Sequence, residues 1–204
     1  MNKIFLQGFI MGLAYVAPIG LQNLFVINTA LTQKKWRSYL TAFIVVFFDI
    51  TLALACFYGI GAIMEKSKML EMSILLIGSI IVMYIGIGLV RSKSDLESDR
   101  NVNLPMAKVI VAACVVTWFN PQAIIDGSMM LGAFKAAIPP HEASNFIFGV
   151  ASASFIWFFG ISTLISLFSA KIDTKVLRYI NLSCGFVIIF YGMKLALTFI
   201  QKLS

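Results

Sequence analysis

Long apolar stretches follow one another along almost the whole chain, and short polar segments separate them. Six of these stretches run approximately over residues 4–31, 39–64, 69–90, 106–134, 146–170 and 176–201. Each is long enough to form a helix that crosses a hydrocarbon core of about 30 Å. The pattern therefore predicts an all-α integral membrane protein with six transmembrane helices. Because the first stretch is too long for the apolar region of a signal peptide, we expect it to be retained.

The most polar internal segment, RSKSDLESDRNVN at residues 91–103, divides the six stretches into three and three. We expect one transmembrane domain over residues 1–204, with a first repeat at 1–90, a cytoplasmic linker at 91–104 and a second repeat at 105–204. An offset of 103 residues lays the second half over the first and pairs Pro121 with Pro18 (121 − 18 = 103). Since each half has an odd number of spans, the second half enters the membrane from the opposite side. The sequence thus predicts a 3+3 inverted repeat with broken helices one and four.

Helix-breaking and amide residues interrupt the first span of each half. They are Pro18, Gly20, Gln22 and Asn23 in APIGLQNLF, and Asn120 and Pro121 in WFNPQAIIDG. A proline within a helix removes a backbone donor and leaves carbonyl groups that lipid cannot satisfy. One such proline is an ordinary kink. Two at matching positions, each beside amides, indicate a binding site between the broken helices.

Two aspartates, Asp49 and Asp126, lie within the apolar stretches, whereas the other acidic residues lie in loops or near span ends. An aspartate at the centre of a membrane helix costs about 2.5–3.5 kcal/mol, which makes both residues functional candidates. A carboxylate in such a place can hold either a proton or a cationic ligand. We expect Asp49, Asp126, Gln22, Asn23 and Asn120 to bind substrate and protons. The structural alternative is that an aspartate pairs with a basic residue of another span.

Composition and charge narrow the classes of function. The chain of 204 residues is 60% hydrophobic and 12% charged, and its net charge of +7 comes from Lys and Arg residues that gather in the predicted loops. Membrane orientation explains this placement, so we expect contact with lipid headgroups and no nucleic-acid partner. The loops after spans one, three and five carry the larger share of the basic residues. The positive-inside rule then places these loops in the cytoplasm and both termini outside.

Several other chemistries lack their sequence signals. The three cysteines form no CxxC pair and the chain has a single histidine, so we expect no metal site. No GxxxxGK(S/T) motif is present, so we expect neither bound ATP nor another cofactor, and nothing in the pattern indicates an enzyme. Gly8 and Gly12 form a GxxxG pattern, which marks either a homodimer face or the close approach of neighbouring helices within the chain.

The motifs resemble a known family. The segment APIGLQNLFVINTAL is similar to the first-span signature of the lysine exporter (LysE) superfamily, which has a PxGPQN core. Asp49 in FFDITLAL and the segment WFNPQAIIDG, which resembles the family's WxNPxxxxD pattern, follow in the expected order across nearly the whole chain. The resemblance implies an amino acid exporter of the bacterial inner membrane. Asp126, five residues after the proline of NP, resembles the lysine and arginine exporters (the LysE/ArgO type) and implies a basic substrate.

The chain also departs from the family pattern. Leu21 stands where a second proline is usual, and the tyrosine common between NP and the aspartate is absent. These departures bear on the identity of the substrate.

The predicted function is secondary-active export of lysine or arginine in exchange for protons. Asp49 and Asp126 receive the cationic side chain or a proton, and the breaks at Pro18 and Pro121 serve as fixed binding points. Two alternatives remain open. One is an exporter of neutral amino acids or another small metabolite, in which the carboxylates handle protons only. The other is a membrane assembly subunit that transports nothing.

Overall fold

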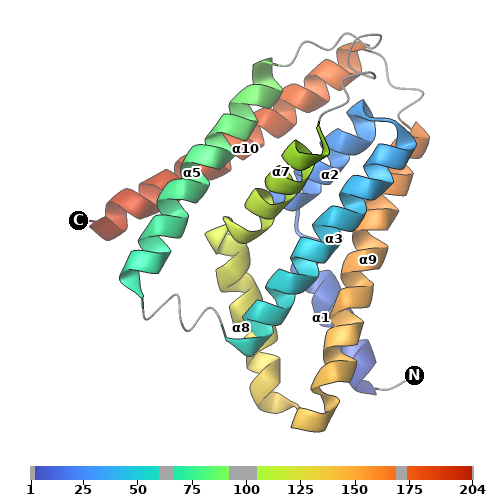
Figure 1. Ribbon diagram of the computed structural model, residues 1–204, viewed down its shortest axis with the longest axis vertical. Coiled ribbons are helices and arrows are strands. Elements are labelled where there is room, and N and C mark those ends of the chain that lie inside the picture. Colours follow the sequence, from blue (N-terminus) through green and yellow to red (C-terminus); the bar gives the residue numbers. More distant parts are fainter. Residues whose placement is uncertain (1–2, 60–66, 92–104, 169–173, 204) are drawn as a thin grey trace.

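The computed structural model describes residues 3–59, 67–91, 105–168 and 174–203, and every regular element in these ranges is a helix (Figure 1). The helices are α1 (Lys3–Val16), α2 (Leu21–Thr32), α3 (Lys35–Tyr58), α5 (Lys68–Arg91), α7 (Met106–Trp118), α8 (Pro121–Ala137), the short 3-10 helix η1 (Pro140–Glu142), α9 (Ala143–Phe168) and α10 (Thr174–Leu203). The predicted all-α class is confirmed. Residues 92–104 of the predicted linker lie outside the described part of the chain.

Helical structure is interrupted at both predicted breaks. The axes of α1 and α2 differ by 77°, and those of α7 and the main part of α8 differ by 61°. Pro18 and Gly20 lie in the first interruption. Pro121 is the first residue of α8, where a proline is tolerated because the N–H that it lacks has no partner inside the helix. Each bent pair thus coincides with one of the predicted apolar stretches.

The helices differ in their ability to cross a membrane. In the described ranges, α3 and the segment Pro140–Leu167, which contains most of α9, are each long and apolar enough to do so alone. Counting each bent pair as one span raises the number to four. Shorter apolar segments lie in α5, at Leu75–Gly88, and in α10, at Gly185–Gln201. The prediction of six spans therefore depends on α5 and α10 and stays a prediction.

Two groups of helices pack together. One group surrounds α3, which contacts α2, α7, α8 and α9, while α1 packs along α9. The second group is the pair α5 and α10, which lie side by side at one edge of Figure 1 and reach the first group mainly through α2, α7 and α8. Val45 of α3 and Phe158 of α9 are fully buried in the core of the first group. This packing brings α3, α9 and the first break together.

The GxxxG pattern of α1 is used inside the chain. A Cβ atom at Gly8 would overlap the backbone carbonyl of Phe146, and one at Gly12 would lie 2.8 Å from the Cα of Val150. Both contacts are with α9, so the two glycines allow α1 and α9 to approach closely. This face is therefore not available to a second copy of the chain.

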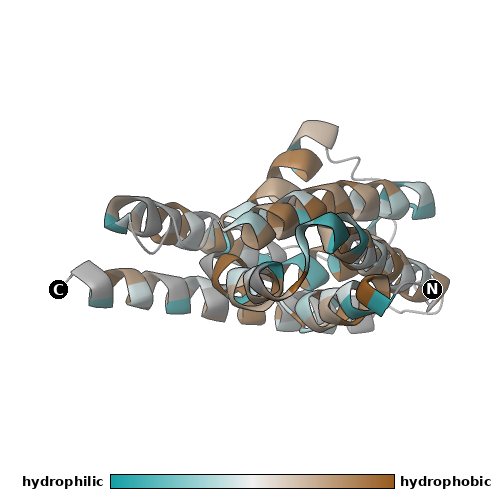
Figure 2. Ribbon diagram, turned by 90° about the horizontal axis from the view of Figure 1, so that it is seen from below, coloured by the Kyte–Doolittle hydropathy of each residue, from teal (hydrophilic) through white to brown (hydrophobic). Residues whose placement is uncertain are grey.

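Large apolar side chains also cover the outside of the molecule. Figure 2 shows hydrophobic colour along much of the helices and hydrophilic colour at several helix ends. Phe43 and Phe47 of α3, and Phe155 and Ile156 of α9, are among the exposed apolar residues. A soluble protein rarely exposes so many large apolar side chains, whereas a membrane protein places them against lipid.

Candidate functional site

Asp49 lies at the centre of a buried hydrogen-bond cluster. It is 14 residues beyond the first residue of α3 (49 − 35 = 14), which is about 21 Å along a helix of about 36 Å. Its side chain is 0% exposed. Gln22 Nε2 donates to Asp49 Oδ1 at 3.1 Å, and Ser154 Oγ donates to Asp49 Oδ2 at 2.6 Å. Two neutral donors from α2 and α9 thus hold the carboxylate.

A fourth side chain extends this Asp49 cluster, which consists of Gln22, Asp49, Thr117 and Ser154. Gln22 Nε2 also donates to Thr117 Oγ1 at 3.1 Å. Thr117 lies near the end of α7, directly before the second break, and it is fully buried. One amide group of the first broken pair therefore donates both to Asp49 of α3 and to the second broken pair.

Asn23 stabilises the first break. Its Nδ2 donates to the carbonyl oxygens of Val16 at 3.0 Å and of Pro18 at 2.7 Å, and Trp157 Nε1 donates to its Oδ1 at 2.9 Å. These carbonyl groups lie at the end of α1 and in the break, where the helix supplies no donors. The side chain is 3% exposed. The structure thus gives Asn23 a role in the backbone of the break, in addition to the substrate contact that the sequence predicts for it.

The second break is built differently. Asn120 precedes α8 and accepts a backbone hydrogen bond from Ile124 at 3.2 Å, but its side chain makes no capping hydrogen bond. Trp118, at the end of α7, donates from Nε1 to Thr51 Oγ1 of α3 at 3.2 Å. The second break is thus connected to α3 by an aromatic side chain, whereas an asparagine closes the first.

Asp126 lies on α8 and, unlike Asp49, is exposed. It belongs to none of the hydrogen bonds that form the Asp49 cluster. The tyrosine Tyr15, at the end of α1, is close enough to interact electrostatically with both carboxylates. The structure therefore brings Gln22, Asn23 and Asp49 together, and it leaves Asp126 on the neighbouring surface of α8.

Three residues of the site were not predicted from the sequence: Thr117, Ser154 and Trp157. Hydroxyl and indole groups are common in apolar helices, so none of these residues stands out alone. One signal was present, because the offset of 103 residues lays Ser154 over Thr51 (154 − 51 = 103). Both hydroxyl groups then lie in the second span of their half. Ser154 donates a hydrogen bond to Asp49, and Thr51 accepts one from Trp118.

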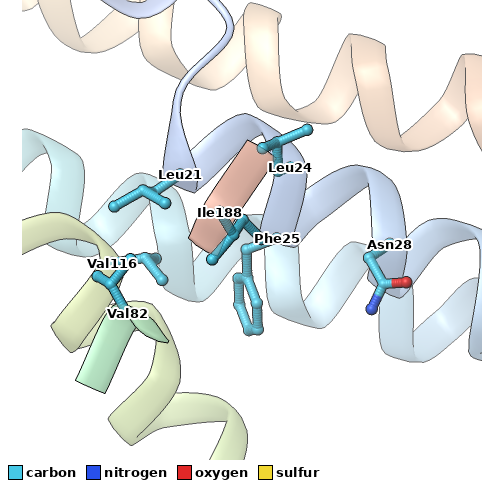
Figure 3. A pocket seen from close by; sticks show the side chains of 7 residues that line it. All are labelled: Leu21, Leu24, Phe25, Asn28, Val82, Val116 and Ile188. Atoms are coloured by element: carbon cyan, nitrogen blue, oxygen red, sulfur yellow. The ribbon is translucent and has the colours of Figure 1, made fainter. Parts of the chain in front are cut away.

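A small pocket lies at the seam between α2 and the α5–α10 pair (Figure 3). Its lining residues are Leu21, Leu24, Phe25, Asn28, Val82, Val116 and Ile188. The cavity measures about 10 Å³, which is room for about one water molecule. It is too small for an amino acid, so the seam is closed in this conformation.

The carboxylates and amides of this site can bind and release a small charged ligand. A buried carboxylate, amide groups beside a break and a second carboxylate on an adjacent helix can hold a cation or a proton without covalent chemistry. No group of three or more His, Cys, Asp or Glu side chains in the described ranges is arranged to hold a metal ion. Among the described side chains, Cys56 and Cys114 are free thiols.

Apolar helices that bend around a buried carboxylate are typical of membrane transport proteins. The model of the LysE type translocator family matches residues 13–198. The chain belongs to this family, and it is a transporter rather than an enzyme. Its family and its apolar helices make it a protein of the bacterial inner membrane.

The chain is also similar to several bacterial proteins over nearly its full length. It is 29% identical to the arginine exporter protein ArgO of Shigella flexneri and of Escherichia coli, and 28% identical to that of Salmonella paratyphi A. Each alignment covers 96% of this chain and 94% of the relative. No solved structure matches the chain.

Proposed function

We propose that the protein exports a cationic amino acid, arginine or lysine, in exchange for protons. The observation that carries this proposal is Asp49, a carboxylate with no exposed surface that lies within an apolar helix beside a break. Relatives named as arginine exporters support the substrate class. Lysine is included because it presents the same amino acid backbone and a single positive charge at the end of a long side chain.

The two carboxylates have different parts in this proposal. Asp126 is exposed on α8, so it meets a substrate cation or a proton that arrives from an open side of the protein. Asp49 is buried and exchanges its neutral donors for the cation or the proton when the helices move. Gln22 and Asn120 offer amide groups to the carboxylate and amine of the substrate. Because proton and substrate compete for the same carboxylates, binding of one favours release of the other.

Electrical work explains why protons are a suitable counter-ion. Moving one positive charge out of a cell that is negative inside costs about 2.3 kcal/mol per 100 mV. An incoming proton moves one positive charge in the opposite direction. One-for-one exchange therefore removes the electrical cost of exporting a monovalent amino acid.

Alternating access follows from two inverted halves that rock around the breaks. Helix contacts support such a repeat, because α3 packs on α9 and α5 packs on α10, and the offset of 103 residues pairs these same helices. The contact between α2 and α9 likewise has its equivalent in that between α8 and α3. A six-span arrangement, with α5 and α10 as the third and sixth spans, fits this pattern.

A second candidate is export of neutral amino acids, with Asp49 handling protons only. It is favoured by the fact that Gln22 and Ser154 already donate to both oxygens of Asp49, so that a cationic side chain competes with two neutral donors. Competition separates the two candidates. Excess arginine or lysine inhibits transport under the first, and only neutral amino acids inhibit it under the second.

The test is efflux from proteoliposomes that are loaded with labelled arginine or lysine. We expect efflux by the wild type and its loss in Asp49→Asn and Asp126→Asn, because each variant removes the charge but keeps the shape of the side chain. Glu142→Gln is the matched control, since it removes a carboxylate from η1 that bonds to Asn145 and lies outside the site. Unchanged efflux in both Asp variants would refute the carboxylate mechanism. Failure of the wild type to move either amino acid would favour a neutral substrate or a subunit that transports nothing.

A further inference from the structure

Tyr15 occupies the last turn of α1, directly before the first break, where α1, α3 and α8 meet. Its ring packs with the apolar clusters on both sides of this junction. Gly127 of α8 makes room for the ring, because a Cβ atom there would lie 3.0 Å from Tyr15 Cε2 and 2.9 Å from Cys56 Sγ. Since Gly127 directly follows Asp126, this contact holds Tyr15 next to the part of α8 that carries the exposed carboxylate.

The hydroxyl group of Tyr15 is buried, and it has no hydrogen-bond partner among the described residues. A buried tyrosine hydroxyl usually finds a partner, because leaving this group unpaired is destabilising. The hydroxyl of Tyr15 thus lies at the site but makes no structural hydrogen bond that would explain its presence there.

Trp118, the residue of the second half that is equivalent to Tyr15, does have a hydrogen-bond partner. The offset of 103 residues lays Trp118 over Tyr15 (118 − 15 = 103), so each break directly follows a turn with an aromatic residue that has a polar tip. Trp118 uses its N–H to reach Thr51. The indole N–H of Trp118 therefore has a structural role, whereas the hydroxyl of Tyr15 is able to bind another partner.

The charged groups around Tyr15 indicate which kind of chemical group can form a hydrogen bond with its hydroxyl. The hydroxyl lies within electrostatic range of Asp49, Cys56 and Asp126, two of which are carboxylates of the proposed site. Asp49 accepts hydrogen bonds from Gln22 and Ser154 but none from the Tyr15 hydroxyl. A group that is attracted by both carboxylates and that carries several N–H donors would satisfy the hydroxyl oxygen. The ammonium group of lysine and the guanidinium group of arginine have this chemistry.

We propose that Tyr15 is a further substrate-binding residue, whose hydroxyl oxygen accepts a hydrogen bond from the cationic side chain of the transported amino acid. The inference rests on the proposed function and adds to it a residue that selects for the cationic end of the substrate. Tyr15 thereby adds a neutral acceptor to the two acidic ones, and the hydroxyl gains its hydrogen bond only when substrate is present.

The test compares Tyr15→Phe with the wild type in two measurements on the purified protein. Half-saturation of arginine efflux from proteoliposomes reports on substrate binding, and the melting temperature in detergent without substrate reports on the fold. We expect the half-saturating arginine concentration to rise about tenfold, as for the loss of one hydrogen bond to a charged group. The melting temperature stays the same or rises, because the substitution removes an unpaired buried hydroxyl.

Two further variants sharpen the comparison. Tyr84→Phe is the matched control, because Tyr84 lies on α5 with 79% of its surface exposed, and we expect both measurements to stay at the wild-type values. Gly127→Ala displaces the Tyr15 ring through the added methyl group, so we expect it also to raise the half-saturating concentration of arginine.

Several outcomes would overturn the inference. If Tyr15→Phe has wild-type half-saturation, the hydroxyl does not bind the substrate, while the proposed function stands. A lower melting temperature of the substrate-free variant would mean that the hydroxyl has a structural partner. If the wild type itself moves neither arginine nor lysine, the proposed function fails first and the inference fails with it.

Discussion

Asp49 is a buried carboxylate that accepts one hydrogen bond from α2 and one from α9. The aspartate and Gln22 were predicted because a carboxylate and an amide are rare within apolar membrane helices. Ser154 was missed, because a serine within a membrane helix is ordinary, and its role depends on how α9 packs against α3. The structural alternative for Asp49 was a Lys or Arg partner. The described residues instead supply two neutral donors, Gln22 and Ser154.

Ser154 is the residue through which α9 positions Asp49. Ser154→Ala removes the 2.6 Å hydrogen bond to Asp49 Oδ2, and hydrogen bonds to charged groups contribute about 1.5–3 kcal/mol. We expect arginine efflux from proteoliposomes to fall by about tenfold or more. Ser152→Ala is the matched control on the same helix, because the Ser152 hydroxyl donates only to the carbonyl oxygen of Phe148. Equal effects of the two substitutions would contradict a specific role for Ser154.

At the level of the helices, the two prolines predicted where the breaks lie but not which contacts stabilise them. Gly20 was predicted to be part of the first break. It lies there with φ −129° and ψ −168°, an extended conformation that any residue adopts. Asn23 instead satisfies two carbonyl groups of the break, which no pattern in the sequence indicates, because these contacts depend on the 77° bend. The stability of the break therefore depends more on Asn23 than on Gly20.

Asn23→Ala and Gly20→Ala test this difference. The first leaves the buried carbonyl of Val16 and two part-buried groups, the Pro18 carbonyl and the Trp157 N–H, without their partner, and an unsatisfied buried group costs about 1–3 kcal/mol. We expect a loss of about 3 kcal/mol or more in the free energy of unfolding. The second adds a methyl group whose nearest neighbour is 3.9 Å away, so we expect a change within about 0.5 kcal/mol.

Unfolding of the purified variants in detergent, followed by circular dichroism, measures both changes. If Gly20→Ala is as destabilising as Asn23→Ala, the conformation of the glycine and not the asparagine side chain maintains the break.

At the scale of the whole molecule, hydropathy predicted an all-helical membrane protein and the approximate extent of its helices. It did not predict that α5 and α10 pair at one edge, because their apolar faces give no information about which helix they meet. The GxxxG pattern of α1 had two interpretations, and the contacts with α9 favour the one within the chain. The charge pattern that sets orientation lies partly in residues 92–104 and 169–173, outside the described ranges.

Orientation is tested by the position of the carboxyl end of the chain. The prediction that both termini face outward follows from the excess of Lys and Arg in the loops after spans one, three and five. We expect an impermeant reagent to label a tag at the carboxyl end of the protein in intact cells. Labelling that requires lysis of the cells would refute the outward assignment.

The central claim is that Asp49 couples export of a cationic amino acid to entry of protons. Its most direct test loads proteoliposomes with arginine, imposes a proton gradient directed inward, and records arginine efflux and internal pH together. The account predicts that the gradient accelerates efflux by the wild type and that internal pH falls with it, whereas Asp49→Asn has neither response. Wild-type efflux that is independent of the gradient, or full gradient-driven efflux by Asp49→Asn, would contradict the account.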